Sequence, residues 1–223
     1  MERQLMTTAD GSHSIYVPQL SEHYHSVHGA VQESEHVFIN AGLLQLPPEQ
    51  TSVQLLEIGF GTGLNAFLTF LHNLPHQNRH ITYTGIEAYP LPAGMVQQLN
   101  YVQQLGAQAY ASVFNALHTG AWEQEIPLWG NFTLLKRQMH IQDLQPTPAR
   151  YHLIYFDAFA PTAQPELWTT AIFETMYLAL LPGGILCTYC AKGAVKRILK
   201  EVGFTVESLP GPPGKRQMTR AVK

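Results

Sequence analysis

Residues 55–65 have the sequence LLEIGFGTGLN, an apolar run that ends in an acid and continues into three alternate glycines. An amphipathic stretch, Leu64–Leu74, follows directly. This order predicts a buried β-strand, a tight turn and the first residues of a helix. Alternate glycines allow backbone conformations that are closed to other residues, and they let a ligand approach the main chain closely. The segment therefore predicts a ligand-binding turn between a strand and a helix.

The spacing of the glycines separates two classes of ligand. Gly59, Gly61 and Gly63 form G-x-G-x-G, whereas the dinucleotide fingerprint is G-x-G-x-x-G, with a helix N-terminus that faces a pyrophosphate. Glu57 stands at the strand end, where its charge would repel a phosphate. An acid beside a glycine turn suits a ligand with an ammonium group, such as the methionine part of S-adenosylmethionine. We predict that these residues and Asn65 bind that cofactor.

Length and composition restrict the class of protein. The 223 residues, of which 45% are hydrophobic, suffice for one domain with a sizeable core and at most a small appendage. No stretch approaches the roughly 18 apolar residues of a membrane span, and residues 1–10 lack the apolar core of a signal peptide. The sequence therefore predicts a cytoplasmic protein without membrane contact.

Two cysteines, Cys187 and Cys190, form C-x-x-C on an apolar run that resembles a strand. Side chains three residues apart on a strand point to opposite faces, and the chain has no second C-x-x-C to complete a zinc site. We predict core cysteines. The histidines His23, His25 and His28 have no accompanying carboxylates or thiols at metal-ligand spacing, so no metal is predicted.

The net charge of −3 conceals an asymmetry along the chain. Residues 192–223 contain eight Lys and Arg residues and two Glu residues, a net charge of +6, whereas residues 1–191 have a net charge of −9. A basic end on an acidic body is typical of nucleic-acid binding. A solvated helix face followed by a tail accounts for the same charges, so the pattern alone leaves both interpretations open.

Residues 1–50 show no clean alternation of strand and helix, and the segment Leu46-Pro47-Pro48 predicts a boundary there. We expect residues 1–50 to form an N-terminal extension that packs over the active site, and residues 51–223 to form the main domain. In this domain apolar strands and amphipathic helices alternate. Strands are predicted at Val53–Ile58, Ile81–Ile86, Phe132–Met139, Tyr151–Phe156, Gly184–Cys190, Phe204–Leu209 and Gln217–Val222, and helices at Leu64–Leu74, Met95–Leu105, Ala111–Gln124, Glu166–Leu180 and Ala194–Val202.

Strands separated by helices imply an α/β fold, with a parallel sheet covered by helices on both faces. The last two strands are joined by the short segment Pro210–Gly214, which predicts a terminal hairpin with one antiparallel strand. A Rossmann-like, doubly wound, mostly parallel sheet of seven strands is the arrangement of class I S-adenosylmethionine-dependent methyltransferases. The sequence predicts this fold.

In open α/β sheets, ligands bind outside the carboxyl ends of the strands, so the residues that follow each strand matter most. Glu87 follows the second strand, where two carboxylate oxygens can accept both ribose hydroxyls. A dehydrogenase would use the same residue, so Glu87 does not discriminate between the two classes. After the third strand, methyltransferases often carry an acid that binds the adenine amine. His140 and Asp143 are the candidates, and the sequence does not choose between them.

The sequence Asp157-Ala158-Phe159-Ala160-Pro161 follows the fourth strand. Amine and amide methyltransferases often place an Asp or Asn, prolines and an aromatic residue at this point. An alkylammonium has a pKa of about 10, and a carboxylate can take up its proton and orient the free amine. We predict that Asp157 is catalytic, that Phe159 walls the site or stacks on a base, and that Pro161 stiffens the loop. The alternative is that Asp157 is a helix cap or turn residue.

Several motifs along the chain together resemble one family, the methyltransferase domain of the tRNA 5-methylaminomethyl-2-thiouridine biosynthesis proteins. The family occurs fused to a flavin oxidase and as a stand-alone enzyme. Its Phe-Gly-Thr-Gly-Leu-Asn and Tyr-His-Ser-x-His-Gly-Ala forms are far more specific than the general methyltransferase glycines. The matching segments are Asp10–Ser14, Glu22–Ser26, His28–Ala30, Gln32–Phe38, Leu56–Asn65, Phe156–Pro161, Pro165–Thr169 and Gly214–Met218.

The resemblance implies a substrate and partners. The family methylates the primary amine of 5-aminomethyl-2-thiouridine at the tRNA wobble position, so a tRNA anticodon loop is the expected partner. The stand-alone form is expected here, with a separate flavin-dependent enzyme in the same pathway. The family pattern has an acid close to Met139-His140 and a Glu where this chain has Gln217.

Four further residues are assigned by their place in these motifs. Tyr24 and His25 are expected to line the pocket, and Lys215 and Arg216 to contact tRNA phosphates, which position RNA without reading its sequence. A loop nucleotide splayed into the cleft is consistent with the way proteins recognise RNA. Three alternatives remain: a methyltransferase of a free small amine, a non-catalytic nucleotide-binding or RNA-binding module, and a dehydrogenase.

Overall fold

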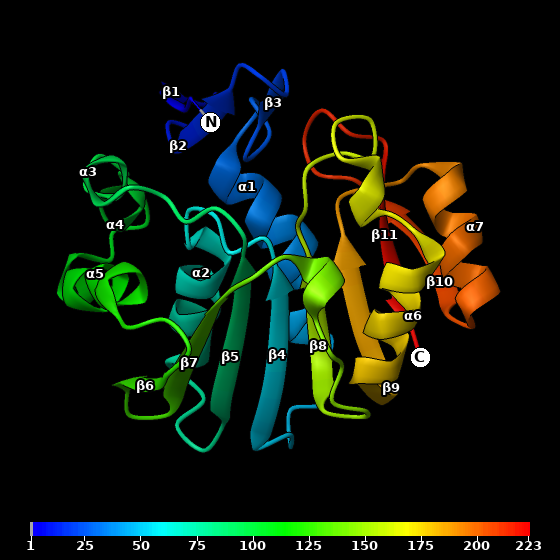
Figure 1. Ribbon diagram of the computed structural model, residues 1–223. Coiled ribbons are helices and arrows are strands. Elements are labelled where there is room, and N and C mark those ends of the chain that lie inside the picture. The colour runs from blue at the N-terminus through cyan, green and yellow to red at the C-terminus, as the bar shows by residue number, and fades with distance from the viewer. Residues whose placement is uncertain (1) are drawn as a thin grey trace.

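The computed structural model describes residues 2–223, and within them eight strands form one large mixed sheet in the order β10-β11-β9-β8-β4-β5-β7-β6 (Figure 1). The five central strands are parallel to one another, while β6, β11 and β10 each run antiparallel to a neighbour. The strands are β4 (Ser52–Ile58), β5 (His80–Glu87), β6 (Glu125–Trp129), β7 (Phe132–Gln138), β8 (Tyr151–Phe156), β9 (Leu180–Thr188), β10 (Thr205–Pro210) and β11 (Gln217–Val222).

Helices cover both faces of this sheet, because successive residues of its central strands point to opposite sides. Leu55 of β4 belongs to one hydrophobic cluster and Leu56 to the other. The helices are α1 (Ala30–Ser34), η1 (Glu35–Asn40), η2 (Leu43–Gln45), α2 (Leu64–Asn73), α3 (Ala93–Val96), α4 (Tyr101–Gln104), η3 (Gln108–Tyr110), α5 (Ala111–Thr119), η4 (Ile141–Asp143), η5 (Pro165–Leu167), α6 (Thr170–Ala179) and α7 (Gly193–Val202).

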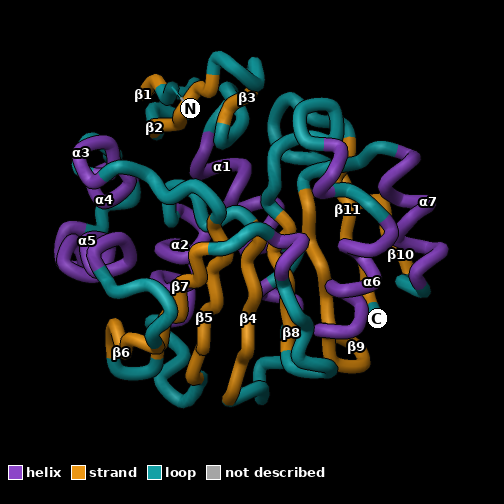
Figure 2. The backbone as a smooth tube through the Cα atoms, in the orientation of Figure 1, coloured by secondary structure: helices purple, strands orange, loops and turns teal. Residues whose placement is uncertain are grey.

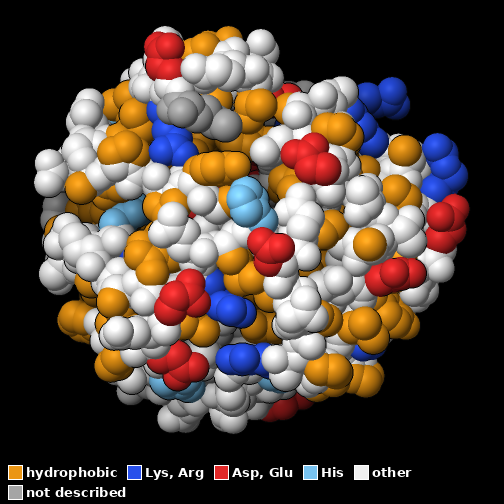
Figure 3. Space-filling view, viewed as in Figure 1, with side chains coloured by type: hydrophobic (Ala, Val, Ile, Leu, Met, Phe, Trp, Pro, Cys, Tyr) orange, Lys and Arg blue, Asp and Glu red, His pale blue; other side chains and the backbone are white. Residues whose placement is uncertain are grey.

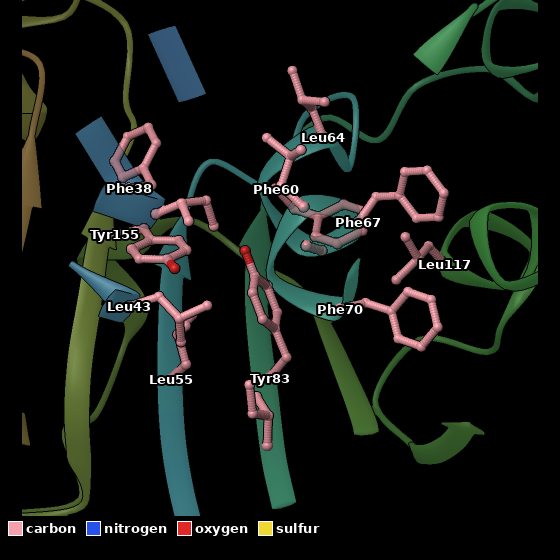
Figure 4. Packing of buried hydrophobic residues seen from close by; sticks show 14 of the residues in the cluster. Phe38, Leu43, Leu55, Phe60, Leu64, Phe67, Phe70, Tyr83, Leu117 and Tyr155 are labelled. Atoms are coloured by element: carbon pink, nitrogen blue, oxygen red, sulfur yellow. The ribbon is translucent and has the colours of Figure 1, made fainter. Parts of the chain in front are cut away.

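The first cluster lies between the sheet and the helices η1, α2 and α5. Figure 4 shows the ring of Phe38 close to that of Tyr155, at a centroid distance of 5.0 Å, with Leu55 and Tyr83 beneath them. The second cluster lies on the opposite face and includes residues of α6 and α7. The central strands are therefore buried on both sides, which explains their nearly continuous apolar sequences.

All seven strands predicted from the sequence are present, and the sheet has an eighth strand that the sequence did not predict. The missed strand is β6, an edge strand that contains Pro127 and alternates exposed with half-exposed residues. The helix predicted over 111–124, just before β6, is shorter than expected, because α5 ends at Thr119, before Gly120. The predicted helix over 95–105 is two one-turn helices, α3 and α4.

The N-terminal residues form a second, smaller sheet above the carboxyl ends of the central strands (Figure 1). Its antiparallel strands are β1 (Gln4–Thr7), β2 (His13–Val17) and β3 (Glu22–His23). It is held to the main domain at Asn100, whose side-chain oxygen accepts the backbone N–H of His13 at 2.9 Å, and at Tyr101, whose hydroxyl donates to the backbone oxygen of His13 at 2.8 Å.

The segment that follows the small sheet joins the main core. Phe38 and Ile39 of η1 are at most 1% exposed and belong to the first hydrophobic cluster. Residues 4–23 thus form a layer of their own, while residues 30–45 pack against the large sheet. The division of the chain at residue 50 stays a prediction. Figure 2 shows helix α1, in purple, and loops, in teal, between the two sheets. Among the helices of residues 2–223, none has both the length and the apolar character needed to cross a bilayer.

Candidate active site

A cavity of about 490 Å³ opens between the carboxyl ends of the central strands and the small N-terminal sheet. Loops that follow β4, β5, β7, β8 and β9 supply one side of it. The segment from β3 to α1 supplies much of the other side, together with Lys215 from the hairpin loop between β10 and β11. The position agrees with the general rule for open α/β sheets, and the volume suits a cofactor-sized ligand.

The glycine turn follows β4 and lines the cavity with main-chain atoms. Gly59 has φ of +89° and Gly61 has φ of +48°, a region that favours glycine. A Cβ atom on Gly59 would lie 2.4 Å from the backbone oxygen of Asp157, and one on Gly61 would lie 3.1 Å from the ring of Tyr24. The turn therefore has no room for side chains. Gly63 lies behind it, as the residue before α2, and does not line the cavity.

Glu57 lies behind the cavity wall. It is fully buried, and burial raises its pKa well above the usual range of a carboxyl group. The side-chain nitrogen of Asn65 donates to Glu57 Oε1 at 2.8 Å and to Asp157 Oδ2 at 2.9 Å. The sequence predicted direct contact between Glu57 and the ligand. The structure places Asn65 between them, because Glu57 still lies within β4, a central and buried strand of the sheet.

Glu87 ends β5 and lines the cavity. Its two carboxylate oxygens accept the backbone N–H groups of Gly61 at 2.9 Å and Tyr89 at 2.8 Å. The carboxylate thus ties the glycine turn to the end of the neighbouring strand. Each oxygen keeps a lone pair for a further donor, which is the capacity that a ribose diol requires.

The end of β7 separates the two candidates for the adenine site. Met139, His140, Ile141 and Gln142 line the cavity, and the ring of His140 meets that of Tyr89 edge-on at 5.5 Å. Asp143 is exposed and lies outside the cavity, because the short η4 helix turns it away. The structure therefore leaves His140 as the candidate that lies at the cavity.

Asp157 lines the cavity on the loop after β8, which is separated by β4 from β5, the strand that Glu87 ends. Its backbone N–H donates to the backbone oxygen of Ile58 at 2.9 Å, which fixes the loop against β4. Burial, and next the negative charge of Glu33, raise the pKa of Asp157 to about 7, while the hydrogen bond from Asn65 and the charge of Lys215 oppose the rise. A carboxyl group with a pKa near neutrality is suited to accept a proton at physiological pH.

The remaining predicted residues divide into two groups. Tyr24, His25, Phe159 and Lys215 line the cavity, with the Tyr24 and Phe159 rings edge-to-face at 5.2 Å. His25 is buried, and burial lowers its pKa to about 4. The structure does not bring the other two residues, Pro161 and Arg216, into the cavity wall. Pro161 lies between cavity-lining residues of its loop without lining the cavity itself, and Arg216 is exposed next to Lys215.

Comparison with known proteins points to the same class of enzyme. A family model described as S-adenosyl-L-methionine-dependent methyltransferase matches residues 113–223, about half of the chain. The chain belongs to the S-adenosylmethionine-dependent methyltransferases. The predicted enzyme class and cofactor are confirmed by the description of this family, and the predicted fold class by solved structures.

Relatives of the methyltransferase match nearly its whole length. It is 32% identical over 218 residues to the tRNA 5-methylaminomethyl-2-thiouridine biosynthesis bifunctional protein MnmC of Cupriavidus necator, in an alignment that covers 92% of this chain and 32% of the relative. The protein of the same name from Chromobacterium violaceum is 31% identical over 209 residues, with 88% and 31% covered. The chain thus spans about a third of the length of these relatives, and the predicted resemblance to them is confirmed.

Solved structures show the same fold. MNMC2 from Aquifex aeolicus superposes with a TM-score of 0.76 at 21% identity, covering 99% of this chain and 70% of that one. Spermidine synthase from Thermotoga maritima superposes with a TM-score of 0.53 at 10% identity, covering 100% and 71%. At these identities the comparison shows the fold alone.

The residues of the methyltransferase fit S-adenosylmethionine. The turn at Gly59 and Gly61 is a cradle that side chains would fill. Asn65 is 3% exposed, and its side-chain oxygen is buried without a hydrogen-bond partner among residues 2–223. That oxygen is an acceptor suited to an ammonium group. Within the same residues, no cluster of three or more His, Cys, Asp or Glu side chains has the geometry of a metal site.

Two residues of the cavity were missed by sequence reasoning. Glu33 of α1 is 6% exposed, and Tyr189 directly follows β9. Both line the cavity near Asp157. Glu33 lies within a family motif, but its role was not inferred because nothing local distinguishes it from a solvated helical acid. Tyr189 belongs to an apolar run that indicates only a buried strand.

Proposed function

We propose that this methyltransferase transfers the methyl group of S-adenosylmethionine to the primary amine of 5-aminomethyl-2-thiouridine at the wobble position of tRNA. The product is 5-methylaminomethyl-2-thiouridine. The observation that carries the proposal is Asp157, a carboxyl group with a pKa of about 7 that faces the cavity beside the glycine turn. The names of the relatives, which span nearly the whole of this chain, support the substrate.

The cofactor would be held by the glycine turn and the ends of β5 and β7. We assign the methionine part to the turn at Gly59 and Gly61 and to the free side-chain oxygen of Asn65. The ribose is assigned to Glu87, and the adenine to the region of His140. When bound, S-adenosylmethionine supplies an electrophilic methyl group on a sulfonium.

Asp157 prepares the nitrogen that accepts this methyl group. The substrate amine, with an ordinary pKa of about 10, reaches the site mostly as an ammonium, which has no lone pair for attack. Asp157 accepts one proton from it, and the Asn65 side chain holds the carboxylate in position through its 2.9 Å hydrogen bond. With this proton removed, the nitrogen has the lone pair that methyl transfer requires, and the cavity would hold it in line with the methyl group that bound S-adenosylmethionine would supply. Fixing this alignment can contribute up to roughly 7–11 kcal/mol.

The charged surface supports RNA as the carrier of the amine. Eight of the 13 Lys and Arg residues belong to residues 192–223. Figure 3 shows Lys and Arg side chains on the side where Figure 1 places α7 and the terminal hairpin, and others near the middle of this face. Lys215 and Arg216 lie on the loop of that hairpin; Lys215 lines the cavity, and Arg216 beside it is exposed. We assign phosphate contacts to them. A tRNA substrate places the enzyme in the cytoplasm, and the aminomethyl group it needs would come from a separate flavin-dependent enzyme.

The test is methylation of isolated tRNA followed by nucleoside mass spectrometry. Purified protein, S-adenosylmethionine and tRNA that carries the unmethylated aminomethyl nucleoside should yield the 5-methylaminomethyl nucleoside. The control is tRNA with an unmodified wobble uridine, which offers no amine and should gain nothing. If the protein binds S-adenosylmethionine by calorimetry and still leaves the aminomethyl tRNA unchanged, the proposed substrate is wrong.

Salt dependence separates RNA from a free amine as the substrate. Binding through phosphate contacts weakens steeply as salt rises, by a slope of about 0.7 in log affinity per contact for single strands. The KM for tRNA should therefore rise between 50 and 200 mM salt. An enzyme of small free amines would show nearly constant KM over this range.

A further inference from the structure

Lys215, Glu33 and Tyr189 meet inside the cavity near Asp157, and each comes from a different part of the chain. The Lys215 ammonium lies 2.5 Å from Glu33 Oε1. The same nitrogen lies 4.0 Å from the centroid of the Tyr189 ring. All four residues line the one cavity. The charges of Glu33 and Lys215 both act on the Asp157 carboxyl, which places the cluster beside the proposed proton acceptor.

Glu33 and Tyr189 are fixed by the fold, whereas Lys215 is not. The second carboxylate oxygen of Glu33 accepts the backbone N–H of Ser26 at 2.7 Å, and the side chain is 8% exposed. The Tyr189 hydroxyl donates to the backbone oxygen of Ala158 at 2.8 Å, which holds its ring against the Asp157 loop. The Lys215 side chain is 33% exposed and stands on a hairpin loop, so it can leave by rotation of its own bonds.

A buried carboxylate oxygen beside an aromatic face is an arrangement that recognises an alkylammonium ion. Lys215 is itself a primary alkylammonium, the same group that an aminomethyl substrate presents. We propose that Glu33 and Tyr189 form the subsite for the ammonium of the substrate, and that Lys215 occupies this subsite until RNA binds. The inference rests on the proposed function, because it names the residues that receive the target amine.

The exchange has a physical reason at each step. Without Lys215, Glu33 would be a buried carboxylate without a cation, which is costly. When the substrate ammonium arrives, it replaces Lys215, and the released ammonium of Lys215 is free to pair with a phosphate of the same RNA. Asp157 then takes one proton from the substrate nitrogen. A free small amine offers no phosphate, so it must displace Lys215 without compensation, and the device favours amines carried by RNA.

The first test compares two substrates of Lys215→Met, which keeps the length of the side chain and loses its charge. The KM for the isolated nucleoside 5-aminomethyl-2-thiouridine should fall roughly two- to five-fold, because Lys215 no longer competes with the nucleoside ammonium for Glu33. The decrease is small because a partly exposed ion pair is weak. The KM for tRNA should rise instead. Lys200→Met is the matched control, because Lys200 is exposed on α7, outside the cavity, and its loss should not change the nucleoside KM.

Two substitutions test the fixed part of the subsite. Glu33→Gln should raise the nucleoside KM about ten-fold, because a charged acceptor is replaced by a neutral one. Tyr189→Phe keeps the ring and should retain the nucleoside KM, whereas Tyr189→Leu should raise it. An unchanged KM in Glu33→Gln, or a nucleoside KM in Lys215→Met that is unchanged or raised, would overturn the inference. If the nucleoside KM of Lys215→Met is unchanged or raised, the ion pair between Lys215 and Glu33 serves only to hold the hairpin loop in place.

A binding measurement separates this inference from the proposed function. Butylammonium, titrated into the protein at constant ionic strength and followed by NMR, needs no turnover. It should bind more tightly to Lys215→Met than to the wild type, and the gain should vanish in the double variant with Glu33→Gln. If the wild type methylates neither tRNA nor nucleoside while butylammonium behaves in this way, the proposed substrate fails and the ammonium subsite stands. Equal binding to all three proteins refutes the subsite.

Discussion

The two ends of the cavity are built in different ways. At the turn end, Gly59 and Gly61 follow β4, and Glu87 ends the adjacent parallel strand β5. At the acceptor end, Asp157 follows β8, Glu33 comes from the N-terminal segment and Lys215 from the terminal hairpin. Side chains provide that surface. The first construction suits a cofactor shared by a whole fold class, and the second suits a substrate that differs between enzymes.

The difference also concerns charge. Glu87 is engaged by the backbone N–H groups of Tyr89 and Gly61, which follow β5 and the adjacent strand β4. Glu33 depends on Lys215, which lies 182 positions away in the sequence. The turn end is therefore complete within the central sheet, whereas the acceptor end exists only when both ends of the chain have packed against it.

The largest expected effect is at the acceptor end. Asp157→Asn keeps the size of the side chain and removes the proton acceptor, so kcat should fall by roughly 10²- to 10⁴-fold. The affinity for S-adenosylmethionine, measured by calorimetry, should change little, because the turn end is intact. Glu174→Gln on the exposed side of α6 is the control for loss of a carboxylate. A variant at 157 with wild-type kcat would remove Asp157 from the mechanism.

The pH dependence of the rate should follow the same residue. Because the pKa of Asp157 is raised to about 7 and its carboxylate form is the active one, kcat/KM should fall about ten-fold for each pH unit below 7. The measurement is kcat/KM for tRNA between pH 5 and 9 at constant ionic strength.

Glu33→Gln sharpens this result. Glu33 contributes to the raised pKa of Asp157, so its neutralisation should move the midpoint toward lower pH. A midpoint that stays in place would show that the two carboxyl groups do not interact.

A smaller effect is expected at the turn end. Glu87→Gln leaves one acceptor oxygen for two backbone N–H groups and the ribose hydroxyls, which the carboxylate serves with two oxygens. The dissociation constant for S-adenosylmethionine should therefore rise about ten-fold. Calorimetry with the cofactor measures it. Asp143→Asn is the control, because Asp143 lies outside the cavity. The affinity of this variant for S-adenosylmethionine should match that of the wild type. If Asp143→Asn weakens the binding of S-adenosylmethionine more than Glu87→Gln does, the cofactor does not bind at Glu87.

The smallest effect concerns stability. The pKa of Asp157 in the folded protein, about 7, lies above its ordinary value of 3.8, so the folded state binds the proton more tightly than the unfolded state. This contribution to stability is complete below about pH 4 and is lost as the pH rises through 7. Asp157→Asn should therefore raise the melting temperature relative to the wild type at pH 8, and the gain should shrink toward pH 4. If the melting temperatures of Asp157→Asn and the wild type differ equally at pH 8 and pH 4, the pKa of Asp157 is not raised in the folded protein.

Local sequence was sufficient for the turn end. The order of apolar run, acid, glycines and amphipathic stretch over 55–74 predicted β4, its turn and α2, and the ends of β5 and β8 located Glu87 and Asp157. It was not sufficient for β6 or for the small N-terminal sheet. Those strands are two to five residues long and carry weak apolar alternation, so their pairing is decided by neighbours elsewhere in the chain.

By itself, the sequence determined the class of fold, the cofactor turn and the carboxyl at residue 157, because each depends on a repeat or a spacing of a few residues. Only the tertiary structure decided that Asn65 stands between Glu57 and the cavity, that Asp143 lies outside it, and that Glu33, Tyr189 and Lys215 meet. Such meetings depend on how distant segments pack over the carboxyl edge of the sheet. Local sequence patterns do not predict this packing, because the burial and pairing of these segments depend on partners that are far away along the chain.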